Sequence, residues 1–422
     1  MSRSHSLIRV TTSATVITVF VTLLAGCGAA MPVPTPTPTA TVLPSGDGIL
    51  RIGTIFPSTG QLASFGPAQV AGVEAAIREI NEAQGVGGVP VEVFHRDSAD
   101  SSTQKAEESL AALIGKGVDV VIGPSASDLA ERLAPLVGDA KVTMISPAAT
   151  HPQLTDIDDA GFFFRTIPAY GQQGTLLGEY LSAAGPVDVA VVYLDDELGR
   201  SLEGALATSL EGQGSVLIAS QAVKPTATDF AKLIAAVKKA RPDVVVLATP
   251  DSAREQTSAI ITQLSAAGLG GTKLWLTSLN TVDYSEALPA GLLVGVSGII
   301  DGAVPDDAFI ARLTQSDPAL SSFRYAAESY DATILAALAA FVIGDDSGQS
   351  VAAALQGVSR GGIKCTSFGE CLDVLKTETD IDYDGLSGPL DFTDAGDVRP
   401  AFYTIYQYNA ENRYEFASGI VG

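Results

Sequence analysis

The sequence predicts an α/β protein with two doubly wound parallel-sheet domains, and three observations support this fold class. Short runs rich in Val and Ile alternate with longer segments of helical period, as in residues 49–124. Strands separated by helices at this spacing form parallel sheets that are covered on both faces. The alternation starts again after residue 170, and a chain of 422 residues is suited to two domains of ordinary size.

The predicted elements follow one another in two series. In the helical segments apolar residues recur three and four positions apart, whereas the strand segments are short apolar runs. The first series has strands at 49–56, 89–97, 118–124 and 141–147, and helices at 67–83, 102–117 and 127–138. The second series has helices at 171–184, 197–211, 227–240 and 252–267, and strands at 187–194, 215–220, 242–250 and 273–278.

The composition argues against some partners and sites. The chain has 25 Lys and Arg against 48 Asp and Glu, which gives a formal net charge of −23. Binding to nucleic-acid phosphates needs a basic surface, so we expect no nucleic-acid partner. The chain has three His and three Cys, too few for a Cys/His zinc cluster or a haem-attachment motif. We therefore expect no metal and no cofactor.

The first 26 residues have the pattern of a secretory signal peptide. Arg3 and Arg9 precede an apolar run over 10–25, which leads into Leu-Ala-Gly directly before Cys27. A cysteine in this position resembles a bacterial lipobox, in which the chain is cut before the cysteine and the thiol is acylated. An acylated Cys27 would anchor the protein to the outer face of the cell membrane. The alternative is an ordinary signal peptide with an incidental cysteine.

Residues 27–48 are predicted to form a tether between this anchor and the folded body. The segment is rich in Pro and Thr and has no charged residue before Asp47. Alternating Pro favours an extended, solvated chain that has no core to join.

Ligands of doubly wound sheets bind beyond the carboxyl ends of the strands. Four polar loops occupy such positions here: 123–128, 146–152, 248–255 and 276–280. In the first loop, Ser127 is predicted to stand at the start of a helix, where unpaired N–H groups attract a carboxylate or phosphate. The alternative is that Ser127 only caps its own helix.

Catalytic motifs are mostly missing, and we expect no catalytic residues. The segment GVSRG at 357–361 matches G-x-S-x-G around Ser359, but no His follows it, as an α/β-hydrolase would require. Ser359 is therefore expected to be a loop residue at a helix end. His95 and His151 have no Cys, Ser or carboxylate partner by motif.

Several segments resemble the type I periplasmic binding proteins, in their leucine/isoleucine/valine-binding branch. The similar segments include IGTIFPSTGQLASFGPAQVAGVEAAIREINEAQGVGG at 52–88, ISPAATHPQLT at 145–155, FFFRT at 162–166 and DGLSGPLDFTDAGD at 384–397. The resemblance covers nearly the whole body in order. Members of this branch are extracytoplasmic receptors that deliver small polar solutes to the permease of an ABC importer, and the resemblance implies that role here.

The resemblance also implies two lobes that are joined by three crossovers and close on a ligand. We expect the crossovers near Pro168, near Ser297 and at 391–398. The first lobe would then contain residues 49–168 and 299–391, and the second lobe residues 169–298 and 398–422.

In the first lobe the resemblance places the ligand carboxylate among hydroxyl and N–H groups. Ser127 falls on the serine of the family's first binding loop, and Ala148 and Thr150 fall on the donors of the second loop. Phe65 falls where the family has an aromatic residue against the ligand. Donors of this kind hold an anion without a buried Arg.

In the second lobe the sequence departs from the family pattern. The family holds the ligand ammonium with an aromatic residue and an acid, but these positions fall on or beside Pro250 and Ser278. A buried ammonium without a carboxylate is costly. Either another acid serves, or the ligand has no α-ammonium. The candidate acids are Asp251, Asp283 and Glu328.

Cys365 and Cys371 lie six positions apart in a chain predicted to be exported. Such a pair is expected to form a disulfide in an oxidising compartment. The C-x-x-C spacing of redox catalysts is absent.

Three functions fit these observations. The first is a lipid-anchored receptor that delivers an amino acid or a related carboxylate-bearing solute to an ABC importer. The second is the same two-lobed module acting as a sensor of amides or other nutrients. The third, from another class, is an exported enzyme whose site the motifs do not reveal.

Overall fold

The computed structural model describes residues 45–422 of the chain. The predicted signal peptide, Cys27 and the predicted tether up to residue 44 lie outside the described residues. The described chain forms two main sheets and one small one.

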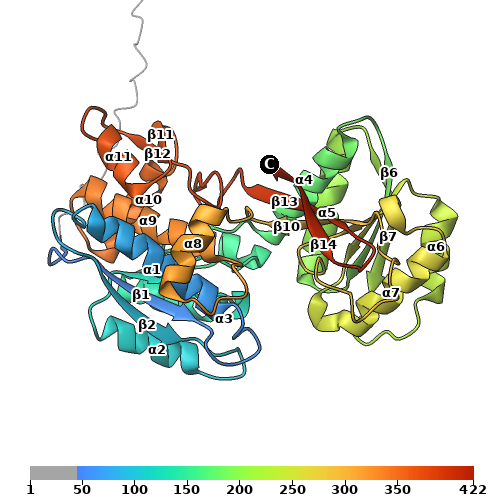
Figure 1. Ribbon diagram of the computed structural model, residues 1–422, viewed down its shortest axis with the longest axis horizontal. Coiled ribbons are helices and arrows are strands. Elements are labelled where there is room, and N and C mark those ends of the chain that lie inside the picture. The colour runs from blue at the N-terminus through green and yellow to red at the C-terminus, as the bar shows by residue number, and fades with distance from the viewer. Residues whose placement is uncertain (1–44) are drawn as a thin grey trace, which may run out of the picture. The chain divides into compact units, whose positions relative to one another are not determined.

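The first sheet has five parallel strands in the order β2-β1-β3-β4-β5, of which β1 and β2 are labelled in Figure 1. Its strands are β1 (Arg51–Phe56), β2 (Glu92–Asp97), β3 (Val120–Ile122), β4 (Thr143–Ser146) and β5 (Phe163–Arg165). The helices that connect them are α1 (Gly66–Glu82), α2 (Lys105–Ile114) and α3 (Ser127–Ala140), followed by the 3-10 turn η1 (Pro152–Asp156).

Both faces of this sheet are buried at the inner strands β1, β3 and β4, which explains why these strands are mainly apolar. Successive residues of a strand point to opposite faces. Val120 and Ile122 thus belong to the core beneath α1, whereas Val121 belongs to the core beneath α2 and α3. The doubly wound arrangement that the sequence predicts is confirmed for this sheet.

The second sheet has seven strands in the order β14-β13-β10-β9-β8-β6-β7. Its parallel strands are β6 (Asp188–Leu194), β7 (Val216–Val223), β8 (Val244–Ala248), β9 (Leu274–Leu276) and β10 (Ser297–Asp301). The helices α4 (Tyr170–Ser182) and α5 (Glu197–Gly212) pack on one face and α6 (Ala231–Ala240) and α7 (Arg254–Ala266) on the other (Figure 1). Two short 3-10 turns, η2 (Asp251–Ala253) and η3 (Gly271–Lys273), lie between these elements.

The end of the chain adds an antiparallel hairpin that the sequence does not predict. It consists of β13 (Phe402–Tyr408) and β14 (Tyr414–Val421), and β13 pairs antiparallel with β10. Only a short loop separates β13 from β14, and a short loop can join antiparallel strands but not parallel ones. The α/β class with parallel-sheet lobes is confirmed, and this edge makes the second sheet mixed.

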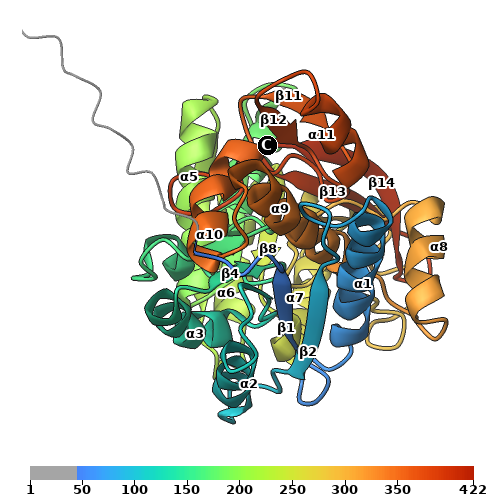
Figure 2. The same ribbon diagram turned by 90° about the vertical axis from the view of Figure 1, so that its left-hand side faces the viewer.

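Residues 307–383 return to the first sheet as helices and a small two-stranded sheet. These elements are α8 (Asp307–Ser316), α9 (Ala326–Ile343), α10 (Gly348–Val358), β11 (Ile363–Cys365), α11 (Phe368–Val374) and β12 (Ile381–Tyr383). The helix α9 packs against α1 and has α10 beside it (Figure 2). It is apolar all round, as expected for a core helix. Among the described helices it alone is long and apolar enough to span a membrane, but 83% of that segment is buried inside the fold.

The chain passes between the two main sheets three times: from β5 to α4, from β10 to α8 and from β12 to β13. A buried ion pair joins the first and third passages, because Arg165 Nε lies 2.6 Å from Asp397 Oδ1. Arg165 comes from FFFRT and Asp397 ends DGLSGPLDFTDAGD, so the two motifs meet in space. The lobe boundaries given above stay a prediction.

The expected disulfide is present. Cys365 in β11 is bonded to Cys371 in α11, and their Cα atoms are 5.2 Å apart. Both cysteines are fully buried. The bridge therefore fastens the end of β11 to α11 within the small subdomain of β11, α11 and β12.

Candidate functional site

The loops after β3 and β4 meet at the carboxyl edge of the first sheet. Ser127 is the first residue of α3, and its Oγ accepts hydrogen bonds from the backbone N–H groups of Thr150 (3.0 Å) and His151 (3.2 Å). Two of the predicted ligand residues, Ser127 and Thr150, are therefore in direct contact. The alternative that Ser127 caps α3 is wrong, since Ala126 holds the cap position and no side chain caps the helix.

Several hydrogen-bond donors at this edge of the first sheet are free to bind a ligand. The hydroxyl hydrogen of Ser127 is free to donate, because its oxygen is the acceptor in both bonds to the second loop. Within residues 45–422, the backbone N–H groups of Ser127 and Asp128 and the hydroxyl of Thr150 have no hydrogen-bond partner. The start of α3 also carries partial positive charge. The edge can accept a carboxylate.

Buried contacts hold the second loop in place from below. Ser146 Oγ donates to the carbonyl of Pro124 (2.7 Å) and accepts from the N–H of Ala149 (3.0 Å). Arg165 Nη1 donates to the carbonyls of Ala149 (3.1 Å) and His151 (2.8 Å). Ala148, another predicted ligand residue, lies within this loop and is buried.

Gln69 adds a polar group to this region that motif reasoning missed. It lies on α1, and its Oε1 accepts a hydrogen bond from Ser125 Oγ at 2.5 Å. Its Nε2 is buried and has no partner among the described residues. A buried amide nitrogen without a partner is costly. Nothing in the sequence distinguishes this glutamine from a helix-surface residue. Only the contact between α1 and the loop after β3 shows that its amide group is buried near the candidate site.

Phe65 stands immediately before α1, and its ring belongs to an aromatic and cationic cluster. The ring centroid lies 5.7 Å from that of Tyr325 in edge-to-face geometry. The guanidinium carbon of Arg324 lies 5.7 Å from the centroid of Phe65 and 5.0 Å from that of Tyr325. Cation–π attraction therefore holds Arg324 beside the predicted ligand aromatic. No motif singles out Arg324 in the sequence.

The second sheet supplies a buried acid next to Ser278. Because β9 and β10 are adjacent and parallel, their carboxyl ends meet at one edge. Gln173 of α4 joins the two ends: its Nε2 donates to Asp301 (2.9 Å) and its Oε1 accepts from the N–H of Ser278 (3.1 Å). Burial raises the pKa of Asp301 to about 6, against an opposing hydrogen bond from the Ser278 side chain. An acid is thus present beside Ser278, the position where this sequence lacks the acid of the family pattern.

Glu328 lies in the first turn of α9, and only 4% of its surface is exposed. It lines a cavity of about 330 Å³ together with Asp301, Arg324, Tyr406 and Tyr414. Burial raises the pKa of Glu328 to about 8, and the nearby carboxylate of Asp331 adds to this rise. Near pH 7 the Glu328 carboxyl is therefore mostly neutral and can donate a hydrogen bond.

The other candidate acids already have partners. Asp251 Oδ1 lies 2.7 Å from Arg254 Nε, and Asp283 Oδ2 lies 3.4 Å from Arg413 Nε. Pro250 precedes the short turn η2 at the end of β8. The N–H of Asp251 donates to the carbonyl of Leu279, so the loops that contain Pro250 and Ser278 are in contact.

The residues that could suggest catalysis have structural roles. Ser359 ends α10 as expected, and its buried hydroxyl donates to the Gln356 carbonyl and accepts from the N–H of Phe392. His95 lies 2.7 Å from Glu74, beside a cavity of about 360 Å³ at the end of β1. His151 lies 2.7 Å from Glu131. Within the described part of the chain neither imidazole contacts a Ser or Cys side chain, and the Nδ1 atom of His95 lies 2.8 Å from the hydroxyl oxygen of Thr54.

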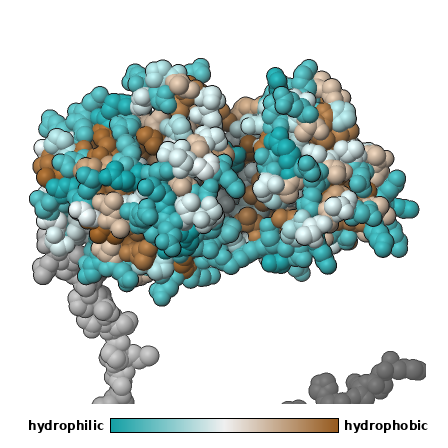
Figure 3. All heavy atoms as spheres, turned by 90° about the horizontal axis from the view of Figure 1, so that it is seen from below, coloured by the Kyte–Doolittle hydropathy of each residue, from teal (hydrophilic) through white to brown (hydrophobic). Residues whose placement is uncertain are grey.

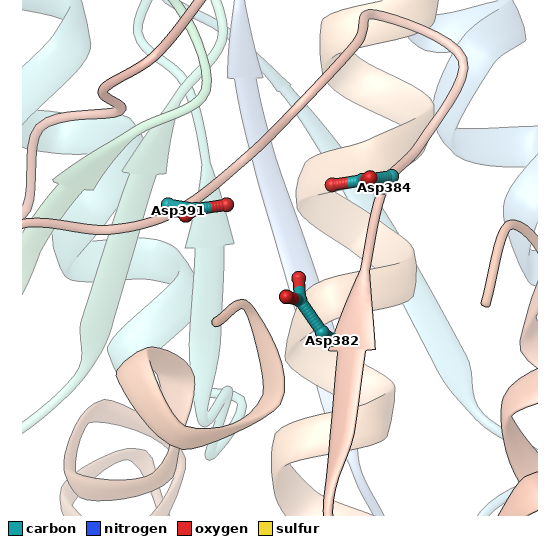
Figure 4. A group of neighbouring side chains, drawn as sticks. All are labelled: Asp382, Asp384 and Asp391. Atoms are coloured by element: carbon teal, nitrogen blue, oxygen red, sulfur yellow. The ribbon is translucent and has the colours of Figure 1, made fainter. Parts of the chain in front are cut away.

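Three acids, Asp382, Asp384 and Asp391, converge in and after β12 (Figure 4). Lys364 Nζ lies 2.9 Å from a carboxylate oxygen of Asp382, 2.9 Å from one of Asp384 and 4.0 Å from one of Asp391. The ammonium group thus takes the place that a cation would occupy among these acids, and the cluster is a salt-bridge network. It belongs to the same subdomain as the disulfide.

The surface is mainly polar on the face shown in Figure 3, where apolar residues lie in small, separate groups. The charged residues of the chain give a net charge of −23. Small, separate apolar groups of this kind are ordinary for a protein surface.

Comparisons with known proteins agree with this architecture. A family model described as "Periplasmic binding protein" matches residues 49–370. The chain is 27% identical over 238 residues to Leu/Ile/Val-binding protein homolog 3 of Brucella melitensis, a match that covers 56% of this chain and 63% of that protein. It is 26% identical over 374 residues to Leu/Ile/Val-binding protein homolog 1 of Brucella abortus, with 86% of this chain and 92% of that protein covered.

A solved structure shows the same fold. It is an ABC transporter substrate-binding protein from Desulfitobacterium hafniense in complex with Leu, and it is similar to this chain with a TM-score of 0.66 at 21% identity. The alignment covers 87% of this chain and all of that one. Since the family model matches well over half of the sequence, the chain belongs to the periplasmic binding protein family.

Proposed function

We propose that the protein is an extracytoplasmic solute-binding protein that delivers an amino acid, or a related small solute with a carboxylate, to an ABC importer. The observation that carries this proposal is the pair of loops after β3 and β4. There Ser127, Thr150 and the start of α3 offer hydroxyl and N–H donors that lack partners in the described chain. Donors with these properties fit a carboxylate.

The second sheet supports an amino acid as one such solute. Asp301 stands beside Ser278 and accepts from Gln173, so a carboxylate is available near the family's ammonium position. The relatives that match this chain are named for binding Leu, Ile and Val. The other candidate acids, Asp251 and Asp283, are paired with arginines instead.

We further propose that residues 1–26 are removed and that acylated Cys27 anchors the protein to the outer face of the cell membrane. The support is Leu-Ala-Gly before Cys27 and the Pro/Thr-rich tether that follows. Fractionation of cells that express the Cys27→Ser variant tests this, because the variant should leave the membrane fraction.

A thermal-shift screen of the full chain tests the binding function. The screen compares the proteinogenic amino acids, their amides, short peptides and simple aliphatic and aromatic acids. A solute that binds only the folded state raises the melting temperature as its concentration increases. We expect at least one carboxylate-bearing solute to raise it and to remain chemically unchanged after incubation. Turnover of a solute, or stabilisation only by solutes without a carboxylate, would contradict the proposal.

A further inference from the structure

A polar cavity of about 330 Å³ lies where the end of β10 faces the start of α9. Its lining comes from three parts of the chain: the end of β10, the segment 321–328 and the hairpin of β13 and β14. Asp301, Arg324 and Glu328 are its charged or titratable groups, and Tyr406 and Tyr414 add phenol rings. The cavity thus joins elements of both main sheets beside the candidate site.

Arg324 is a cation without a close ion-pair partner in this cavity, although the charge of Asp301 acts on it from a greater distance. Within residues 45–422 no carboxylate oxygen lies within 4.0 Å of its guanidinium group, although eight other arginines have such a partner. Its Nε is buried and makes no hydrogen bond to the described chain. The rings of Phe65 and Tyr325 fix the position of the group. A partly buried guanidinium with an unpaired donor favours an incoming anion.

The start of α9 adds further donors. The helix is 18 residues long, and Ala327 in its first turn lines the cavity. The structure gives the Ala327 N–H no hydrogen-bond partner among residues 45–422. Neighbouring Glu328 is nearly fully buried, its carboxyl has a hydrogen bond from its own backbone N–H and none from another residue of the described chain, and it is mostly neutral near pH 7. A neutral carboxyl and a free N–H at a helix N-terminus both donate to an anion.

Asp301 is the one group in the cavity that would repel an anion. Its carboxyl already accepts a hydrogen bond from Gln173 at 2.9 Å, and Ser278 supplies another. The unpaired groups of the cavity, Arg324 and the N–H of Ala327, are therefore hydrogen-bond donors. The carboxyl of Asp301, which is the main acceptor, already has hydrogen-bond partners. This imbalance points to an acceptor on the solute.

We propose that this cavity binds a second anionic group of the solute, so that the transported solute is an acid with two carboxylates or an equivalent pair of anionic groups. One anion would be held by the loops of Ser127 and Thr150, and the other by Arg324 and the start of α9. Phe65 connects the two places, because its ring contacts Arg324 while its helix α1 reaches the first loop through Gln69 and Ser125. The inference rests on the proposed function and narrows its substrate class.

Isothermal titration of the full chain with matched solutes tests this inference. The probes are L-glutamate against L-glutamine and glutarate against its monoamide, with L-leucine as an amino acid without a second polar group. In each pair the two members differ little in size and differ in the second anionic charge. We expect the acid of at least one pair to bind at least tenfold more tightly than its amide.

Variants of Arg324 then test whether this residue causes the preference for the acid over its amide. Arg324→Gln should weaken binding of the preferred acid at least tenfold and change binding of the amide less than threefold. Arg324→Lys keeps the positive charge and should retain part of the preference for the acid. It replaces Arg324→Gln in the test if the Gln variant does not fold. Arg360→Gln is the matched control, since Arg360 is exposed and paired with Asp394; it should leave both affinities unchanged.

The outcomes separate this inference from the proposed function. If the wild type binds L-leucine or the amides but neither acid more tightly, the second anion site is wrong and solute binding stands. The second site is also wrong if Arg324→Gln and Arg324→Lys both keep the full preference for the acid. If no carboxylate-bearing probe or solute of the thermal screen binds, both proposals fail.

Discussion

Glu328 shows how burial changes what a single residue can do. The sequence offers it as one of three acids that could hold a ligand ammonium, and the fold places it in the first turn of a core helix. Burial raises the pKa of Glu328 to about 8. Near pH 7 it is therefore better suited to donate a hydrogen bond than to neutralise a cation.

This raised pKa predicts a pH-dependent stability. The folded state keeps the Glu328 proton up to about pH 8, whereas an exposed glutamate loses it near 4.5. The folded state then binds more protons, so the contribution of Glu328 is largest below pH 4.5 and is lost as the pH rises to 8. Glu328→Gln cannot ionise. Its stability relative to the wild type should increase between pH 5 and 8, by at most about 1.4 kcal/mol per pH unit, and then level off.

Urea unfolding at pH 5, 6.5 and 8 measures this effect. Asp119, whose pKa burial also raises, is present in both proteins and is not among the groups that act on Glu328, so its effect cancels in the comparison. Glu211→Gln is the control, because Glu211 is exposed on α5. Parallel pH curves for the wild type and Glu328→Gln would show that Glu328 is already ionised in the folded protein.

At the scale of elements, hydrophobic periodicity predicts most of the two sheets. It places β1, β3, β6 and β8 correctly, because strands buried on both faces are continuous apolar runs in the sequence. It leaves out most of residues 307–383 and the C-terminal hairpin. α9 is apolar on every side and shows no helical period, and β13 is recognisable only from its pairing with β10.

The candidate site likewise has one part that the sequence predicts and one part that it does not. The loops with Ser127 and Thr150 follow predicted strands, so position and resemblance together identify them. Asp301 and Arg324 could not be found in this manner. Asp301 reaches Ser278 only because β9 and β10 are neighbours, and Arg324 acquires its surroundings from Phe65, which is more than 250 positions away in the chain.

The contact between α1 and α9 depends on one glycine. A Cβ atom at Gly72 would lie 2.2 Å from the backbone carbonyl oxygen of Ala326, at the start of α9. Because that atom belongs to the backbone, the helices would have to move apart. Gly72→Ala should therefore destabilise the protein by about 1–3 kcal/mol or more and weaken solute binding, since Arg324 and Glu328 flank Ala326 in the chain.

Gly204→Ala is the matched control for this prediction. Gly204 lies in the interior of α5, and a Cβ atom there would have nothing within 4 Å. The alanine should stabilise the protein by roughly 0.5–1 kcal/mol through the higher helix propensity of alanine. Thermal unfolding of both variants gives the comparison. An unchanged or higher melting temperature for Gly72→Ala would show that the helices adjust to the added atom.

At the scale of the whole molecule, the fold brings together polar loops from two sheets. The serine of the G-x-S-x-G segment is a buried helix-end residue, and both histidines in the described chain pair with glutamates. What remains at the carboxyl edges is a set of hydroxyl, N–H and guanidinium donors and one acid beside Ser278. Such groups have the chemistry to hold a small polar solute, which is the function proposed above.

The binding affinity of Ser127→Ala and Thr150→Ala tests this account most directly. The solute is the strongest stabiliser found in the thermal screen, titrated calorimetrically into the full chain, with Ser101→Ala as the exposed control. Each change should weaken binding by about 1–3 kcal/mol, the cost of an unmet hydrogen bond to a charged group, while the control binds like the wild type. Unchanged affinity in both variants would contradict the account and move the carboxylate elsewhere.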